Sequence, residues 1–231
     1  MYKWTLWALL PLPLAALAWD LLISPDDALL GPSQRIFYIH MGCAVGAALA
    51  FTVTALASLA YLIRRQSRYD AVAAASAEIG TMLTTIVLAT GVLWGRVAWG
   101  IWWTWDPRLT TTLILWLLFA GYLMLRQTQR GHEVRARTSA VLALLFYVDV
   151  PIDYMSIRWW NSIHPIVITS HGVNMAPPMV AAMLITIAMV GGLYAVWLPM
   201  HVRLATLADK LREIKQTARL RSQNGLSEER L

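Results

Sequence analysis

Six apolar stretches decide what this chain can fold into, and all but the short fourth and fifth reach the length needed to cross a lipid bilayer. A helix needs about 20 predominantly apolar residues to span the hydrocarbon core. Only 14% of the residues are charged, against about a quarter in soluble domains, and the stretches lack the alternation of barrel strands. The sequence therefore predicts an all-α polytopic membrane protein with six transmembrane helices. The expected spans are Trp4–Ile23, Ile36–Ile63, Ile79–Ala98, Thr110–Leu125, Ser139–Met155 and Pro178–Leu198.

The basic residues predict how these spans are oriented. If the N-terminus is cytoplasmic, fifteen lysines and arginines fall in cytoplasmic segments and four on the opposite side. Basic residues are enriched in cytoplasmic loops. We therefore expect both termini to be cytoplasmic. The net charge of +6 is explained by this distribution and gives no reason to expect nucleic acid as a partner.

The first span resembles a cleavable signal peptide in one respect. Lys3, the apolar run and Ala16-Leu17-Ala18 follow the order that a signal peptidase recognises. The run is nevertheless long enough to span, and we expect it to be retained.

The chain divides into a membrane domain, 1–200, and a cytoplasmic tail, 201–231. The tail carries apolar residues at helical spacing between charges, which predicts a short amphipathic helix followed by a disordered end. Such a helix would dock on a partner, lie on the membrane or remain solvated. The apolar positions are Leu204, Leu207, Leu211 and Ile214.

The segment richest in candidate functional residues begins at the end of the third span. Five of the twelve tryptophans fall within twelve residues, 94–105, next to Asp106 and Arg108. Indoles gather at membrane interfaces, so an aromatic belt is one interpretation. A belt does not require the order Trp-Trp-x-Trp-Asp-x-Arg, which favours a flat surface for a large planar ligand that carries charge. Asp106 and Arg108 are also expected to pair locally and fix the loop.

Three of the five histidines are predicted on the same side of the membrane as this segment: His40, His164 and His171. An ionisable side chain at the edge of an apolar span is a functional candidate. Neutral imidazole is a good iron ligand, and a haem iron accepts one ligand on each face. His40 and His164 are far apart in sequence and could approach from opposite sides, while His171 is a reserve candidate.

Trp99-Gly100-Ile101-Trp102-Trp103-Thr104-Trp105-Asp106-Pro107-Arg108-Leu109-Thr110 resembles the tryptophan-rich signature of the WWD family, the haem-handling proteins of cytochrome c maturation. Trp159-Trp160-Asn161-Ser162-Ile163-His164 resembles the second outer segment of that family. A six-span chain of this length is similar to its CcmC branch. Arg158, Pro165 and His171 depart from the pattern expected around this second segment.

The resemblance implies that the chain binds haem b on the periplasmic face of the bacterial inner membrane and presents it for covalent loading onto the chaperone CcmE. It also implies CcmA, CcmB and CcmD as partners. His40 and His164 would be the axial ligands, and Arg35 a propionate partner. The haem and chaperone platform would comprise Trp99, Trp102, Trp103, Trp105, Asp106 and Arg108.

Two other functions are compatible with such residues. One is a CcsA-like cytochrome c synthase, which would need extra spans and a second histidine pair. The other is a cytochrome b-like electron-transfer subunit, in which histidines lie near mid-span. The sequence has no phosphate-cradling Gly-x-x-x-x-Gly-Lys-Ser/Thr motif, and its single cysteine, Cys43, cannot form a Cys-x-x-Cys-His haem-attachment motif. A haem-transfer component is favoured over a stand-alone enzyme.

Overall fold

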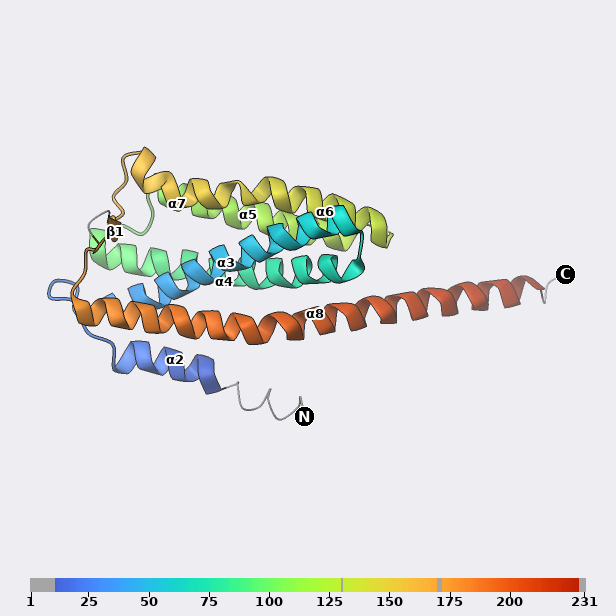
Figure 1. The fold of residues 1–231 in the computed structure, drawn as a ribbon, viewed down its shortest axis with the longest axis horizontal. Helices are drawn as coiled ribbons and strands as arrows, with labels where there is room; N and C mark the ends of the chain where they lie inside the picture. The colour runs from blue at the N-terminus through green and yellow to red at the C-terminus, as the bar shows by residue number, and fades with distance from the viewer. Residues whose placement is uncertain (1–10, 130, 170–171, 229–231) are drawn as a thin grey trace.

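The computed structural model describes residues 11–129, 131–169 and 172–228 and is mainly helical. Within these residues five helical segments are long and apolar enough to cross a membrane. The sixth predicted span, Trp4–Ile23, falls partly on residues 1–10, which lie outside the described residues. Its remaining part is α2 (Pro11–Leu22), which runs beside α8 (Figure 1).

The centre of the bundle is formed by α3 (Gln34–Arg64) and α4 (Ser67–Trp99), with α5 (Pro107–Thr128) packed beside them. Phe51 of α3 stacks on Phe119 of α5, with ring centroids 3.9 Å apart. A Cβ at Gly80 of α4 would lie 2.7 Å from the Phe51 ring, so the absence of a side chain at Gly80 lets α4 pack closely against α3. The predicted spans 36–63 and 110–125 lie inside α3 and α5.

The fifth predicted span is built from two helices, α6 (His132–Tyr147) and α7 (Asp149–Trp159). Val148 lies between them with helical dihedral angles, so the two form one candidate span of 28 residues. Pro151 is tolerated because it lies in the first turn of α7, where backbone N–H groups have no intrahelical partner.

The last helix, α8 (Pro177–Glu228), packs against α3 through a small-residue motif. Cβ atoms at Gly42 and Gly46 would lie 2.9 Å from Thr186 and 2.7 Å from Val190. Two glycines four residues apart let helix backbones approach closely within a membrane. Before α8, β1 (Ile168–Thr169) and β2 (Gly172–Val173) form a two-stranded antiparallel hairpin.

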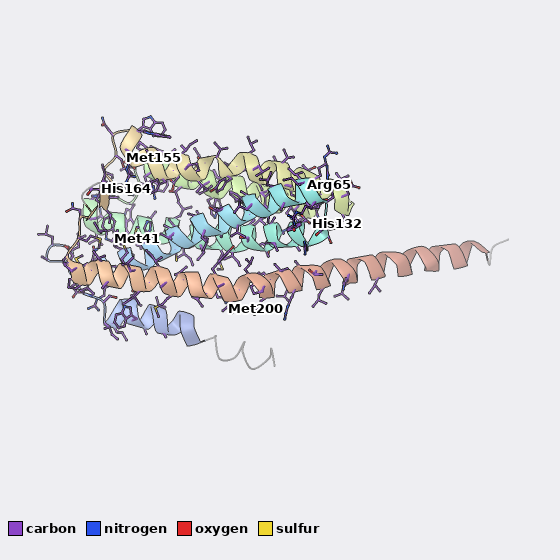
Figure 2. The ribbon with its side chains drawn as sticks, viewed as in Figure 1. Met41, Arg65, His132, Met155, His164 and Met200 are labelled. Carbon is purple, nitrogen blue, oxygen red and sulfur yellow. The ribbon has the colours of Figure 1, made fainter. Side chains whose placement is uncertain are left out.

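The two ends of the bundle differ in chemistry. Figure 2 places His164 and Met41 toward one end, and Arg65 and His132 toward the other. The hairpin and the Trp-rich segment are at the His164 end, whereas α8 extends well beyond the bundle at the opposite end (Figure 1). The functional residues are therefore expected at a single end.

Candidate functional site

His40 and His164 line a common cavity, although they are 124 positions apart in the sequence. This deep cavity, of about 420 Å³, lies between α3, α4, α5 and the α6–α7 segment. A second, smaller cavity of about 110 Å³ shares both histidines and Arg108 but is also lined by Phe37, Trp94, Arg158 and Pro165. We call it the mouth cavity, because these additional residues are at the end of the bundle that carries the hairpin.

The imidazole of His40 is held by α4. Its Nδ1 lies 3.2 Å from the Thr90 hydroxyl, which donates its own proton to the Ile86 carbonyl at 2.6 Å. The Thr90 oxygen is therefore an acceptor, and Nδ1 of His40 is the protonated nitrogen. A Cβ at Gly91 would lie 3.2 Å from His40 Cε1, so the absence of a side chain there makes room for the ring. Nε2 of His40 keeps its lone pair.

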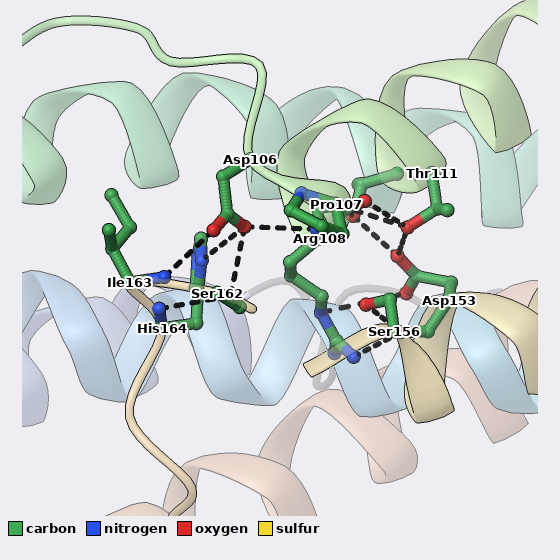
Figure 3. Close-up of polar contacts among 10 residues, drawn as sticks. Asp106, Pro107, Arg108, Thr111, Asp153, Ser156, Ser162, Ile163 and His164 are labelled. Carbon is green, nitrogen blue, oxygen red and sulfur yellow. Dashed lines mark hydrogen bonds and ion pairs between the residues drawn. The ribbon is translucent and has the colours of Figure 1, made fainter. Parts of the chain in front are cut away.

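The imidazole of His164 is held by Asp106, as Figure 3 shows. Nδ1 lies 3.0 Å from Asp106 Oδ1. An ionised carboxylate can only accept hydrogen bonds, so Nδ1 is the donor and Nε2 keeps its lone pair. Trp99 packs edge-on against the same ring, with centroids 4.8 Å apart. A histidine whose second nitrogen is bound to a carboxylate is a common arrangement for metal ligands.

Asp106 is 8% exposed and accepts three further hydrogen bonds. The donors are the backbone N–H groups of Arg108 (2.9 Å) and Ile163 (2.8 Å) and the Ser162 hydroxyl (3.0 Å). The bond from Arg108 makes Asp106 the N-cap of α5, with Pro107 at the first helical position. One carboxylate thus fixes the start of α5, the 162–163 turn and the His164 ring.

Burial and hydrogen bonding shift the pKa values of both Asp106 and His164. Burial alone would raise the pKa of the Asp106 carboxyl, but the donors around it, Ile163 first, outweigh that effect and hold the pKa below its usual value. Burial lowers the pKa of His164, and the attraction of Asp106 only partly offsets this. A carboxylate and a neutral imidazole are therefore the favoured pair near neutral pH.

The guanidinium of Arg108 points to α7 instead of to Asp106. It donates to the Asp153 carbonyl at 2.7 Å, and its Nε lies 3.7 Å from the Asp153 carboxylate. That carboxylate also accepts from Thr111 (2.7 Å) and Thr112 (2.9 Å). The expected Asp106–Arg108 pair therefore forms through the Arg108 backbone N–H, while the side chain joins α5 to α7 beside the deep cavity.

The four tryptophans predicted to form the haem platform divide into two groups, according to whether they contact His164. Trp99 contacts His164, whereas Trp102 and Trp105 are 56% and 75% exposed. Trp103 packs edge-on against Trp105 at 5.7 Å. Within the described residues, those three indoles line neither the deep nor the mouth cavity.

Two other residues predicted from the sequence, Arg35 and His171, are not among the described residues that line the two cavities. Arg35 pairs with Asp26 at 2.7 Å and donates to the Leu21 carbonyl, and it is not among the residues that line either cavity. His171 lies outside the described residues. Sequence reasoning did not select Thr90, Gly91 or Tyr154, because a hydroxyl, a glycine or an aromatic residue within an apolar span carries no signal of its own. It also missed Asp153, whose position near the end of the fifth predicted span was a signal that could have found it.

The helical spans and the cavity define a multi-span α-helical membrane protein with a mainly apolar, histidine-lined cavity in its helical bundle. The family model for Heme exporter protein C (CcmC) matches residues 1–217. The chain belongs to this family.

Several curated relatives carry the same name. The chain is 39% identical over 142 residues to Heme exporter protein C of Bradyrhizobium diazoefficiens, covering 62% of this chain and 54% of that protein. It is 34% identical over 146 residues to the Escherichia coli K12 protein, covering 63% and 60%. To the Rhodobacter capsulatus protein it is 31% identical over 223 residues, covering 95% and 92%. The matched part thus spans just over half of the first two relatives and most of the third.

Proposed function

We propose that this chain binds haem b at the outer face of the bacterial inner membrane and presents it for covalent loading onto the chaperone CcmE. The observation that carries the proposal is the histidine pair. His40 and His164 line one cavity, and each has its Nδ1 occupied as a donor, which leaves Nε2 as the ligand atom. Iron in haem takes one such imidazole on each face.

The surroundings of the pair suit this ligand. The deep cavity is lined mainly by apolar residues, with Arg108 and Asp153 as its charged groups, which fits a flat hydrophobic ring with polar edges. Trp99 supports the His164 ring. The name shared by the family and these relatives, Heme exporter protein C, agrees with haem as the cargo.

Three indoles that line neither cavity are assigned a different task. In this proposal the exposed Trp102 and Trp105, with the partly buried Trp103 packed against Trp105, form the surface on which CcmE docks, since aromatic side chains are favoured at protein interfaces. The wider assembly comprises CcmA, CcmB and CcmD, with any ATP use in those partners. Six spans with both termini cytoplasmic complete the proposal, together with a membrane domain over 1–200 and a tail over 201–231.

A reduced-minus-oxidised spectrum of the purified protein, combined with a covalent-haem gel stain of the membranes, tests this function. We expect a b-type spectrum on this chain, no covalent haem on it, and covalent haem on CcmE. Covalent haem on an apocytochrome in the absence of CcmE would instead indicate a synthase. A stable b-type haem with no loading of CcmE would indicate an electron-transfer subunit.

The docking role is tested by replacing Trp102, Trp103 and Trp105 together with Ala. We expect this variant to keep most of its haem, because the iron ligands are untouched, and to load less CcmE per molecule. Phe at the same positions should rescue part of the loading, since it keeps a ring. Normal loading by the Ala variant would leave these indoles with no role beyond anchoring at the interface.

A further inference from the structure

An apolar stripe runs along the distal part of α8, at the end of the bundle opposite to His164. Its four residues are spaced three, four and three positions apart, which places them on one face of the helix and matches the seam of a coiled coil. Each side chain is 57% to 65% exposed, so the described residues leave this face largely uncovered. We call it the tail stripe: Leu204, Leu207, Leu211 and Ile214.

The charged residues of this segment are sorted around the tail stripe. When the stripe occupies the a and d positions of a coiled-coil heptad, Lys210 falls at g and Lys215 at e, the two edges of the seam. Asp209 and Glu213 fall at f and c, on the opposite face of the helix. The face therefore combines an apolar seam with basic edges, and its complement is an apolar seam with acidic edges.

A second copy of this chain does not supply that complement. In a parallel pair of helices, the g position of one copy faces the e position of the other, so Lys210 would meet Lys215. In an antiparallel pair, g faces g and e faces e, which again places lysines together. Like charges across an interface oppose binding. Charge therefore favours a partner of a different sequence over self-association.

The membrane surface does not fit the direction of α8. A basic amphipathic helix can lie in the interface, but it then runs along the plane of the bilayer. The helix α8 is continuous from Pro177 to Glu228, and Figure 1 shows it continuing past the bundle in nearly the direction of its membrane span. Pro199 lies before the tail stripe and does not interrupt the helix. The stripe is thus carried away from the bilayer.

The length of the tail stripe indicates what kind of partner can use it. The stripe covers about three helical turns, which makes a small interface with little affinity of its own. A partner anchored in the same membrane would be held close to the stripe, and its effective concentration would compensate for weak binding.

We propose that the tail stripe is the docking surface for an amphipathic helix with acidic edges, carried by a partner anchored in the same membrane. The proposal depends on α8 alone and not on haem binding, so each can fail without the other. It selects protein docking from the three roles that the sequence of the tail allows.

Two labelled three-heptad peptides test this surface. Both have leucine at a and d, and one has glutamate and the other lysine at e and g, so that like charges keep each peptide from pairing with itself. Each is titrated into the full-length protein in phosphatidylcholine nanodiscs and followed by fluorescence anisotropy. We expect the glutamate peptide to bind at least about tenfold more tightly, because like charges across an interface cost several kcal/mol.

A charge reversal tests the edges without altering the apolar seam. Lys210→Glu with Lys215→Glu should reverse the preference, so that the lysine peptide binds more tightly. Arg212→Glu with Arg219→Glu is the matched control, since it changes the net charge equally at b positions, outside the seam and its edges. We expect this control to keep the preference for the glutamate peptide. Leu211→Asn should weaken the binding of both peptides.

Three results would overturn the proposal. The first is equal binding of the two peptides by wild type, or binding of neither. The second is a dimer in mass photometry that Leu211→Asn dissociates, which would make a second copy the occupant. The third is a blue shift of an environment-sensitive dye at Ile214→Cys, in a Cys43→Ala background, when phosphatidylglycerol is added to the nanodiscs. That shift would place the stripe on the membrane surface.

Discussion

His40 and His164 line the same cavity, but the molecule holds them in different ways. His40 is part of α3, and its ring meets a neutral hydroxyl, Thr90, and the bare backbone at Gly91. His164 belongs to an irregular segment after α7, and its ring is anchored by a carboxylate that also binds its neighbours. A helix fixes the backbone of its histidine through packing, so one neutral hydrogen bond is enough to orient the ring.

His164 lies on a loop, so more interactions are needed to fix its backbone and its ring. Asp106 fixes the ring of His164, the Ile163 N–H and the Ser162 hydroxyl at once, so the position of the backbone and the orientation of the ring depend on one group. The comparison predicts that His164 is more sensitive than His40 to the loss of its hydrogen-bond partner.

The largest effect is expected when both rings are removed. His40→Ala with His164→Ala should abolish the Soret band of the purified protein, because the cavity then lacks both imidazole ligands. His201→Ala is the control, since that histidine bonds to a carbonyl of α8 and lies away from the cavity. An unchanged Soret band in the double variant would show that the pair does not bind the iron.

Asp106→Asn should have the next largest effect. It keeps the shape of the side chain but removes the charge that sets the Nδ1 proton of His164, and haem affinity should fall by about 10- to 100-fold. Haem titration and the low-temperature spectrum measure this. Asp27→Asn, which removes a carboxylate that caps another turn, should change neither. Normal haem binding by Asp106→Asn would show that the ring of His164 does not need a charged hydrogen-bond partner.

Thr90→Val should have the smallest effect of the three. The change preserves side-chain shape and removes one neutral hydrogen bond, so haem affinity should fall by about two- to tenfold. Thr90→Ser keeps the hydroxyl and should restore the affinity. A larger loss for Thr90→Val than for Asp106→Asn in the same titration would reverse the comparison between the two histidines.

Among the described residues, five helices are long and apolar enough to cross a membrane, and they overlap the second to sixth predicted spans. The apolar length of a span can be read from the sequence, but the ends of its helix cannot. The third span was predicted from Ile79, whereas α4 begins at Ser67. Its first turns carry Asp70, which is buried and paired with Arg126 of α5 at 2.6 Å. Hydropathy treats such a residue as the edge of a span, while the folded bundle neutralises it with a partner from another helix.

The sequence analysis names His40, His164 and Asp106 as site residues, and in the structure the two histidines line one cavity and His164 contacts Asp106. The motif indicates Asp106, but no local pattern indicates that its carboxylate binds the ring of His164. Likewise the arginine selected for carboxylate binding was Arg35, which lies beside Asp26, while Arg158 lines the mouth cavity. Which groups meet depends on how α5 and α7 pack, and this is not encoded in local spacing.

The helix α8 continues far beyond its contact with α3, with Pro199 inside this extension. Its contact with α3 is at Gly42 and Gly46, immediately after His40, and from Val190 the helix continues to Glu228. At about 1.5 Å per residue that arm is roughly 57 Å long. A tilt of about 5° at the glycines would therefore displace its far end by about 5 Å, by simple trigonometry on that length. A partner that binds the far end of α8 would therefore act, through the length of this helix, on α3, which carries His40.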